Sequence, residues 1–322
     1  MEFTNKDIRT WSILGQRGTF GIAMLDVADN NHKIIGLSAD LCNTSGMDRF
    51  ANKYPERFIN TGIAEQNMVG MAGGLADAGF IPICTSFANF IALRSNEFVR
   101  HFLSYMQCNV KLVGLSAGFG MELFGNTHYG VEDIACLRTY PNLTILSPAD
   151  GVEVVKCVEA AAKTEGPFYI RLTGKMNQPM VHRSDIDFQI GKNITLKEGA
   201  DVAIFATGGM VSRALKAADK LAESGVDAAV IDVHTLAPFD KDSVLKELDK
   251  KLLVSVEEHS VVGGLGTIIA DTLSETQHNT RLLKLGVAHE FKKAGEYEYM
   301  LEVNRLTADM IAEDILEVSN GF

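Results

Sequence analysis

The chain has 322 residues, of which 46% are hydrophobic and 22% charged, a composition that is ordinary for a folded protein of two domains. Its net charge of −11 is spread along the sequence, which argues against nucleic acid as a partner. No apolar run approaches the roughly 18 residues that a membrane span needs, and residues 1–20 lack the apolar block of a signal peptide. The five cysteines form no CxxC pair, so we expect reduced thiols, a cytoplasmic location and no metal held by this chain.

Apolar strands alternate with helical patterns through the first half of the chain. Strands are predicted over residues 33–40, 57–62, 80–87, 109–117, 142–150 and 167–172, and helices over 63–79, 89–107, 130–140 and 151–165. Continuous apolar strands between helices are typical of a parallel sheet that is covered on both faces. Residues 173–199 are polar and irregular, which predicts a linker that could include a small edge hairpin.

The same alternation resumes after this linker. Strands are predicted over residues 201–208, 227–236, 251–259 and 281–287, and helices beginning near Ser212, Lys241 and Gly264, with a closing helix over 305–320. We therefore predict an α/β protein made of two consecutive parallel-sheet αβα sandwiches, with domains over residues 1–185 and 193–322.

One carboxylate stands out against its neighbours. Residues 58–80 read FINTGIAEQNMVGMAGGLADAGF, and they place Glu65 at the head of a run of small and apolar residues. An acid in the first turn of a helix complements the helix dipole, so Glu65 has a structural explanation. However, Gly70, Gly73 and Gly74 each cost a helix about 1 kcal/mol relative to alanine, which suggests close packing against another backbone, centrally or at a subunit interface. A carboxylate at the tip of such a helix would be partly buried and suited to sharing a proton.

Five segments, spread in order along the first half of the chain, resemble the transketolase family of thiamine-diphosphate enzymes. They are GLSADL (36–41), TGIAEQNMVGMAGGLADAGF (61–80), TSFANF (85–90), GNTHYG (125–130) and LSPAD (146–150). The stretch from residue 201 to 266 resembles the C-terminal domain of the same family, so the resemblance covers nearly the whole chain. Each motif alone is weakly specific, whereas the five in this order are strongly specific.

The resemblance implies a cofactor site. Glu65 would contact the ring nitrogen N1′ of the aminopyrimidine of thiamine diphosphate and share a proton with it. Phe87 and Phe90, one or both, would stack on that ring. Without the family, these two phenylalanines, three residues apart, could as well be core aromatics on one helical face or at the point where a strand leads into a helix.

The resemblance also implies substrate residues. His128 would contact the donor sugar and join Glu65 in catalysis, and Asp40 would lie near the sugar hydroxyls. Thr44 and Arg17 would contact a substrate phosphate. A lone histidine is often structural, and Arg17 could be a solvated surface residue.

Three positions depart from the pattern of the family. Ser116 stands where the sugar transketolases have a histidine, Phe124 where they have an aspartate that reads sugar stereochemistry, and Gly174 where they have a phosphate-binding arginine. Because a site that loses polar groups discriminates less well between hydroxyl configurations, we expect a substrate other than the usual pentose phosphates.

A motif is also missing. The family holds the cofactor's diphosphate through a divalent metal bound by a GDG motif and a following Asn, and the 322 residues contain no GDG. The resemblance therefore implies the C-terminal subunit of a split transketolase, with thiamine diphosphate as cofactor and Mg²⁺ or a similar ion held by an N-terminal partner subunit. We expect self-dimerisation and an α2β2 assembly with that partner.

The expected activity is transfer of a two-carbon ketol unit from a ketose donor to an aldose acceptor, either of them a sugar or a sugar phosphate. Two alternatives stay open, the β subunit of a thiamine-dependent 2-oxo acid dehydrogenase and a non-catalytic assembly paralogue. The SADL turn and the NTH loop favour transketolase over the first, and retention of Glu65, Phe87 and Phe90 argues against the second.

Overall fold

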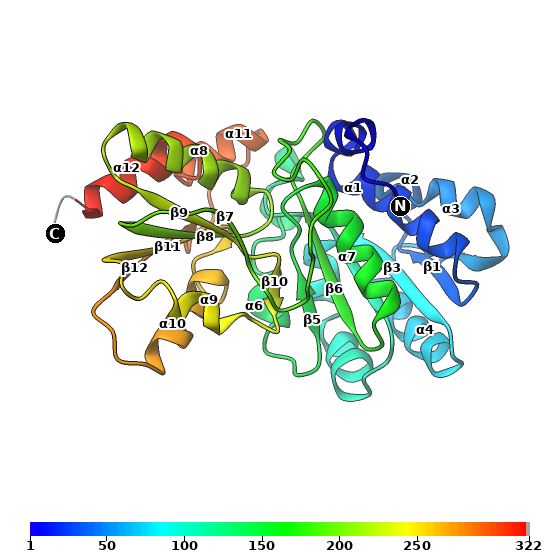
Figure 1. Cartoon of the computed structure of the whole chain (residues 1–322). Coiled ribbons are helices and arrows are strands. Elements are labelled where there is room, and N and C mark those ends of the chain that lie inside the picture. The colour runs from blue at the N-terminus through cyan, green and yellow to red at the C-terminus, as the bar shows by residue number, and fades with distance from the viewer. Residues whose placement is uncertain (320–322) are drawn as a thin grey trace.

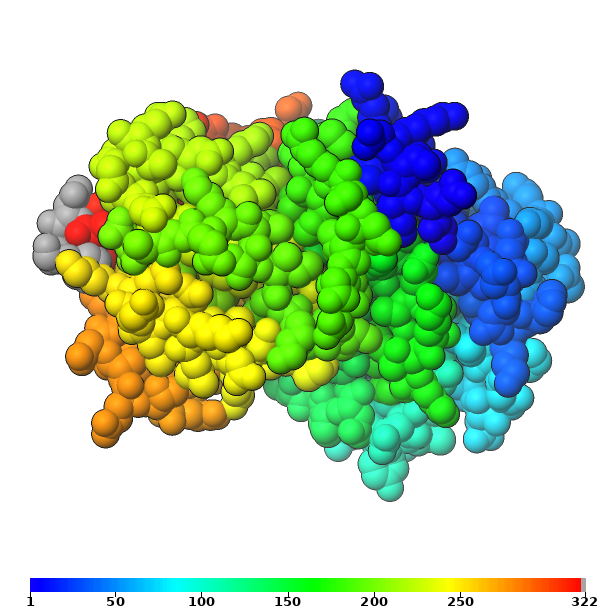
Figure 2. Space-filling view, in the orientation of Figure 1, coloured from blue at the N-terminus to red at the C-terminus, as the bar shows by residue number. Residues whose placement is uncertain are grey.

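Two mostly parallel β-sheets organise the chain, one built mainly from its first half and one from its second (Figure 1). The structure is a computed structural model, and it describes residues 1–319. The strand order is β10-β5-β6-β4-β3-β1-β2 in the first sheet and β12-β11-β8-β9-β7 in the second. Figure 2 shows the first half of the chain, blue to green, on one side of the molecule and the yellow to red second half on the other. The predicted α/β class with two α/β units is confirmed.

The first sheet consists of short apolar strands, nearly all of them buried. They are β1 (Ile34–Ser38), β2 (Phe58–Asn60), β3 (Ile81–Phe87), β4 (Lys111–Ala117), β5 (Thr144–Leu146), β6 (Phe168–Thr173) and β10 (Thr235–Ala237). All pair in parallel except β10, which is antiparallel to β5. The carboxyl ends of the parallel strands therefore lie at one edge of the sheet, which is where open α/β sheets bind their ligands.

Helices cover both faces of this sheet. One face is packed by α1 (Asn5–Asp29) and α7 (Gly151–Lys163), with α2 (Cys42–Ser45), α3 (Asp48–Lys53) and the 3₁₀ turn η1 (Pro55–Arg57) nearby. The other is packed by α4 (Glu65–Asp77), the π-helical segments η2 (Phe90–Arg94) and η3 (Val99–Tyr105), α5 (Asn96–Phe98) and α6 (Asp133–Leu137). The predicted helix over 89–107 is thus helical, but π turns make up most of it.

The sequence patterns did not predict α1, and this helix carries a kink. At Gly15, φ is +69°, and an added Cβ would lie 2.3 Å from the carbonyl oxygen of Lys175. Only glycine tolerates both the left-handed conformation and this close approach. The kink therefore brings α1 against the start of the linker.

The second sheet has the same layered build. Its strands are β7 (Ile194–Lys197), β8 (Val202–Ala206), β9 (Ala228–Asp232), β11 (Leu252–Ser260) and β12 (Arg281–Val287). Figure 1 shows α8 (Met210–Glu223), α11 (Tyr297–Val303) and α12 (Ala308–Ser319) on one face, and α9 (Lys241–Leu245) and α10 (Leu265–Ser274) on the other. Residue 320 of the predicted closing helix lies outside the described residues. Within residues 1–319, every helix is too short or too polar to cross a lipid bilayer.

Two local predictions are wrong, and both concern the junction of the two halves. The strand predicted over 227–236 divides after Asp232, and its second part, β10, leaves the second sheet to pair with β5 of the first. The linker forms no hairpin of its own; its last residues form β7, which pairs antiparallel with β9 at the edge of the second sheet. The two halves are therefore interlocked by hydrogen bonds, and the division at residues 185 and 193 stays a prediction.

Candidate active site

Glu65 is the first residue of α4, and its side chain is buried, with 1% of the residue exposed. Its Oε1 accepts a hydrogen bond of 3.0 Å from the Ser86 hydroxyl at the end of β3. Its Oε2 lies 2.7 Å from Nη1 of Arg94 at the end of η2. The carboxylate thus contacts β3 and η2 at the carboxyl edge of the sheet, beyond any role in capping its own helix.

The glycines of α4 that follow Glu65 do not pack against another backbone as predicted. An added Cβ at Gly73 would lie 2.6 Å from the ring of Phe102, so an aromatic side chain, and not a backbone, is the close neighbour there. The prediction of close backbone packing is therefore wrong for Gly73 within this chain. Gly74 is exposed and has open space around its Cα, which leaves that face of α4 uncovered in the single chain.

Aromatic rings gather beside Glu65 where β3 leads into η2. Phe87 ends β3 and Phe90 begins η2, with ring centroids 5.9 Å apart. The ring of His128 lies 6.2 Å from Phe87 and 5.3 Å from Phe90, and Phe124 lies 5.2 Å beyond it. We call Phe87, Phe90, Phe124 and His128 the aromatic cluster. Arg94 links Glu65 to this cluster, because it contacts both the Glu65 carboxylate and the Phe90 ring. The structure therefore brings together four of the residues singled out for cofactor and substrate, Glu65, Phe87, Phe90 and His128.

The loop that carries His128 is held by the second half of the chain. This loop follows β4 and contains the 3₁₀ segment η4 (Glu122–Thr127). Oε1 of Glu258, at the carboxyl end of β11, accepts from the N–H of Phe119 at 2.6 Å, and Oε2 accepts from the Tyr297 hydroxyl at 2.8 Å. Burial raises the pKa of Glu258, although the hydrogen bond from Phe119 opposes the shift. On its other side the loop is fixed by Asn89, whose side chain donates to the carbonyl of Thr127.

The other predicted substrate residues lie outside the aromatic cluster. Asp40 follows β1, exposed and in a left-handed conformation, and its Oδ1 accepts from the Asn60 amide at 3.1 Å. Thr44 is exposed on α2. Arg17, on α1, lines a separate cleft of about 810 Å³ that also contacts Glu122 of η4. Burial lowers the pKa of Arg17, so a cation is kept partly away from water here.

The three departures from the family pattern have distinct surroundings. Ser116 is buried, and its hydroxyl has no hydrogen-bond partner among the described residues. Phe124 is two-thirds exposed beside His128. Gly174 has φ of +72°, and an added Cβ would lie 1.9 Å from Nε2 of Gln178. An arginine at residue 174 would therefore require both a strained backbone and a displaced Gln178.

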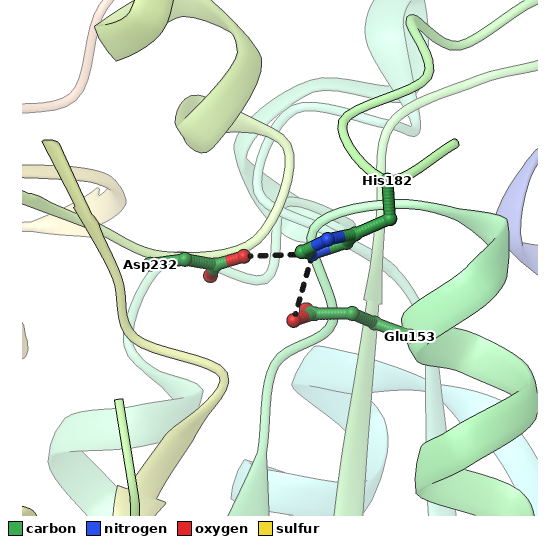
Figure 3. Close-up of side chains that lie close together, drawn as sticks. All are labelled: Glu153, His182 and Asp232. Atoms are coloured by element: carbon green, nitrogen blue, oxygen red, sulfur yellow. Dashed lines mark hydrogen bonds and ion pairs between the residues drawn. The ribbon is translucent and has the colours of Figure 1, made fainter. Parts of the chain in front are cut away.

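A second buried group of polar side chains lies at the junction of the two halves (Figure 3). Nε2 of His182 is 3.3 Å from Oε1 of Glu153 and 3.3 Å from Oδ2 of Asp232. Burial alone would lower the pKa of His182, but hydrogen bonds with Asp232 and Glu153 raise it to about 10. Burial and the charge of Glu153 raise the pKa of Asp232. We call Glu153, His182 and Asp232 the junction triad.

Sequence patterns missed Arg94 and the junction triad. Arg94 lies 29 residues from Glu65, in the stretch over 89–107 that was predicted only as a helix. The triad comes from a helix, a linker and a strand end, 29 and 50 residues apart in sequence (182 − 153 and 232 − 182), so no spacing motif could mark it.

Comparison with known proteins identifies the family. Residues 15–178 match "Transketolase, pyrimidine binding domain", and residues 191–311 match "Transketolase, C-terminal domain". A "Putative transketolase C-terminal section" from Methanocaldococcus jannaschii is 34% identical over 304 residues, which cover 94% of this chain and 96% of that protein. The 6-deoxy-6-sulfo-D-fructose transketolase subunit SqwH from Clostridium sp. is 38% identical over 94% of either chain.

Solved structures agree with these relatives. A structure described as "Split gene transketolase, inactive beta4 tetramer" has a TM-score of 0.86 at 37% identity, over 95% of this chain and 98% of that chain. A transketolase from Campylobacter jejuni shares the fold over 94% of this chain and 46% of its own, with a TM-score of 0.79. The predicted family is therefore confirmed: with a pyrimidine-binding domain matched over residues 15–178 and a C-terminal domain over 191–311, this chain belongs to the transketolase family.

Proposed function

We propose that this chain is the C-terminal subunit of a thiamine-diphosphate-dependent transketolase, which transfers a two-carbon ketol unit from a ketose donor to an aldose acceptor. One observation carries the proposal. A carboxylate that is 1% exposed, Glu65, lies at a helix N-terminus beside the half-buried rings of Phe87 and Phe90.

These residues fit the aminopyrimidine of the cofactor. A flat heteroaromatic ring with basic nitrogens is complemented by aromatic faces for stacking and by a buried carboxyl group for one nitrogen. Glu65 would hold a proton at the ring nitrogen N1′, and Phe87 and Phe90 would orient the ring and exclude water. When bound, the cofactor supplies the carbanion chemistry that the side chains of this chain cannot.

A partner subunit is part of the proposal. The sequence lacks the GDG motif, so the diphosphate and its Mg²⁺ would be held by an N-terminal subunit in an α2β2 assembly. The split-gene relative of known structure is described as an inactive tetramer of β chains, which supports the need for a second kind of chain. The uncovered face of α4 at Gly74 supports contact with a second copy of this chain.

The substrate would be a ketose with an anionic end. We place its reacting end at His128 and Asp40. The anionic end would lie in the cleft at Arg17, with Thr44 close to that end. The lining of this cleft has four cationic side chains, Arg17, Lys175, Arg213 and Lys216, and three acidic ones, Glu122, Glu296 and Glu298. Lys175 pairs with Glu122 and Arg213 with Glu298, so Arg17 and Lys216 are the cations that would serve an anionic substrate. Curated relatives are named for a sulfonated sugar and for a sugar phosphate, which supports an anionic substrate class for this chain.

The test is reconstitution with kinetics. The chain is co-expressed with an N-terminal transketolase subunit that carries GDG, and ketol transfer is measured with thiamine diphosphate and Mg²⁺. We expect activity from the mixture and none from either chain alone. Arg17→Met should raise KM for phosphorylated or sulfonated donors and leave an uncharged ketose unaffected. Ketol transfer by this chain alone would contradict the split-subunit proposal, and transfer only to a lipoyl group would indicate a 2-oxo acid dehydrogenase subunit.

A further inference from the structure

The junction triad joins three separate parts of the chain. Glu153 comes from the first turn of α7, His182 from the linker and Asp232 from the end of β9 (Figure 3). The residues are 0%, 6% and 0% exposed, and one ligand atom from each lies within 4.8 Å of the others. The triad shares no residue with the aromatic cluster, and the partners of Glu65 within residues 1–319 are Ser86 and Arg94.

The backbone around the triad is fixed by a single aspartate. Oδ2 of Asp150 accepts from the N–H groups of Val181 and His182, both at 2.8 Å. Its Oδ1 caps α7 by accepting from the N–H groups of Val152 and Glu153. Asp150 therefore holds His182 near the start of α7, and each of its two carboxylate oxygens already accepts two hydrogen bonds. The triad is preorganised by its neighbours and not only by contacts among its own side chains.

The carboxylate oxygens of the triad do not all have close hydrogen-bond partners. Oε2 of Glu153 accepts from the N–H of Ala149 at 2.7 Å, which leaves Oε1 to face His182. The contact of Oε1 of Glu153 with Nε2 of His182 is long, at 3.3 Å, and Oδ1 of Asp232 has no hydrogen-bond partner among residues 1–319. A buried carboxylate oxygen without a close partner is unfavourable, because burial removes its hydration. The junction triad therefore has carboxylate oxygens that are free to bind a cation.

The two contacts of His182 are long for charge-assisted hydrogen bonds, and their length also fits a bound metal ion. Charge-assisted N–H···O bonds are usually about 2.7–2.9 Å long, whereas both contacts of His182 Nε2 are 3.3 Å. Two ligands that each lie about 2.0–2.1 Å from a tetrahedral Zn²⁺ are separated by roughly 3.3–3.4 Å. The two contacts therefore have the length of tetrahedron edges around a central ion.

Charge and ligand type agree with this geometry. A metal ion would displace the proton of His182, because an imidazole binds metal in its neutral form. Two carboxylates and a neutral imidazole then carry a charge of −2, which a divalent cation balances inside a buried site. One imidazole with two carboxylate oxygens is a ligand set that suits zinc and its neighbours among the transition metals. His234 lies near enough to interact electrostatically with Glu153 and His182. It is 0% exposed, and its Nε2 has no partner among the described atoms, so it could supply a fourth donor.

We propose that Glu153, His182 and Asp232 form a structural binding site for one Zn²⁺-like ion, which ties the linker to both halves of the chain. His234 Nε2 or a water completes the coordination. This ion is distinct from the Mg²⁺ of the proposed cofactor site, since its ligands all belong to this chain. The site would stabilise the junction where the chain passes from β9 of the second sheet to β10 of the first.

The test uses the whole chain, freed of metal with a chelator and then titrated with Zn²⁺ or Co²⁺. We expect one equivalent of metal per chain by elemental analysis, a higher melting temperature with Zn²⁺, and the visible absorption of four-coordinate Co²⁺. His182→Gln and Glu153→Gln should each lose the stoichiometric metal and the spectrum. His101→Gln, at an exposed histidine, is the matched control and should retain both.

Circular dichroism of each variant shows whether it is folded before metal is added, so a loss of binding is not confused with unfolding. Absence of stoichiometric metal from the folded wild-type chain would overturn the site and leave a proton-sharing triad. Retention of the metal by both folded glutamine variants would overturn it as well. Neither result depends on the partner subunit or on ketol transfer, so the proposed function is tested separately.

Discussion

Arg94 contacts two of the three side chains that are proposed to bind the cofactor ring, Glu65 and Phe90. Its Nη1 lies 2.7 Å from Oε2 of Glu65, and its guanidinium carbon lies 4.0 Å from the centre of the Phe90 ring. The carboxylate is buried, whereas the arginine side chain is 40% exposed. A ring that stacks on Phe90 and bonds to Glu65 would therefore compete with Arg94 for the same two contacts.

Replacing Arg94 by methionine should strengthen cofactor binding. Without Arg94, the buried Glu65 carboxylate has no cation to stabilise it in the cofactor-free state. The cofactor then binds without having to displace an arginine from Glu65, so its affinity rises. We expect the Kd of thiamine diphosphate to fall by roughly 3- to 10-fold, corresponding to about 1 kcal/mol. Calorimetric titration of the assembled complex measures it, with Arg100→Met, at an exposed arginine, as the matched control. Weaker binding by Arg94→Met would show that Arg94 helps to hold the cofactor.

His128 is predicted to act on the donor and not on the cofactor. His128→Ala removes a polar group from the aromatic cluster, so kcat/KM for ketose donors should fall about 5- to 150-fold, the effect of losing a contact of about 1–3 kcal/mol. The Kd of the cofactor should stay unchanged, because Glu65, Phe87 and Phe90 remain. Steady-state kinetics and cofactor titration separate the two effects.

Phe124 should make the enzyme tolerant of donor stereochemistry. Its side chain cannot hydrogen-bond a hydroxyl, yet its ring lies 5.2 Å from that of His128. Two donors that are epimeric at the carbon facing this loop should be used at similar rates by the wild type, and Phe124→Asp should separate them. Strong discrimination by the wild type, unchanged in Phe124→Asp, would show that this loop does not contact the donor.

Arg171 and Asp133 form a buried ion pair behind the His128 loop. Nε of Arg171 lies 2.9 Å from Oδ2 of Asp133, and its Nη2 donates to the carbonyls of Gly130 and Glu258. Arg171→Met should lower the free energy of unfolding by about 3–5 kcal/mol, because it leaves a buried carboxylate without its cation. The double variant Arg171→Met/Asp133→Leu should recover part of that loss.

Urea denaturation measures both variants of this pair. Arg305→Met is the matched control, because Arg305 pairs with Asp314 at the surface and should contribute less than about 1 kcal/mol. If Arg171→Met and Arg305→Met lowered the free energy of unfolding equally, burial would not explain the importance of the Arg171–Asp133 pair.

Lys111 predicts a pH dependence of stability. It lies on β4, 1% exposed, with Nζ donating to the carbonyls of Thr164 and Gly166, and burial lowers its pKa from 10.5 to about 7. Between these values the folded chain binds one proton fewer than the unfolded chain, so stability rises with pH from about 7 to 10.5 and is lost as pH falls back across this window. Lys111→Met should flatten this rise by up to about 1.4 kcal/mol per pH unit in urea titrations. An unchanged slope would mean that Lys111 stays charged when buried.

Strong local patterns explain why much of the fold was predictable. Strands β1, β3, β4 and β6 are continuous apolar runs, and each was predicted within a few residues of its observed bounds. The helix α1 was not predicted, because Gly15, Gly18 and Gly21 interrupt its apolar periodicity. Gly15 and Gly21 are explained only by close approach to the backbone of Lys175 and of Gly46. The place of β10 depends on pairing with β5, which no local pattern of residues 235–237 encodes.

Only those site residues that lie within sequence motifs could be predicted. Glu65, Phe87 and His128 lie in recognisable segments, and the fold brings these segments to one edge of the first sheet. Arg94 and the junction triad depend on which side chains meet across the fold, so their roles emerge only from three-dimensional distances.

Glu65→Gln tests the central claim, that this carboxyl group exchanges a proton with the thiamine cofactor. Glutamine keeps the volume and can still hydrogen-bond, but it cannot take up and release the proton. The measurement is hydrogen–deuterium exchange at the reactive carbon of the thiazolium ring, followed in the complex assembled with the N-terminal subunit. We predict that Glu65→Gln slows this exchange by up to about 10⁴-fold while folding and assembly stay intact. Exchange at the wild-type rate would contradict the account and leave Glu65 as a structural partner of Arg94 and Ser86.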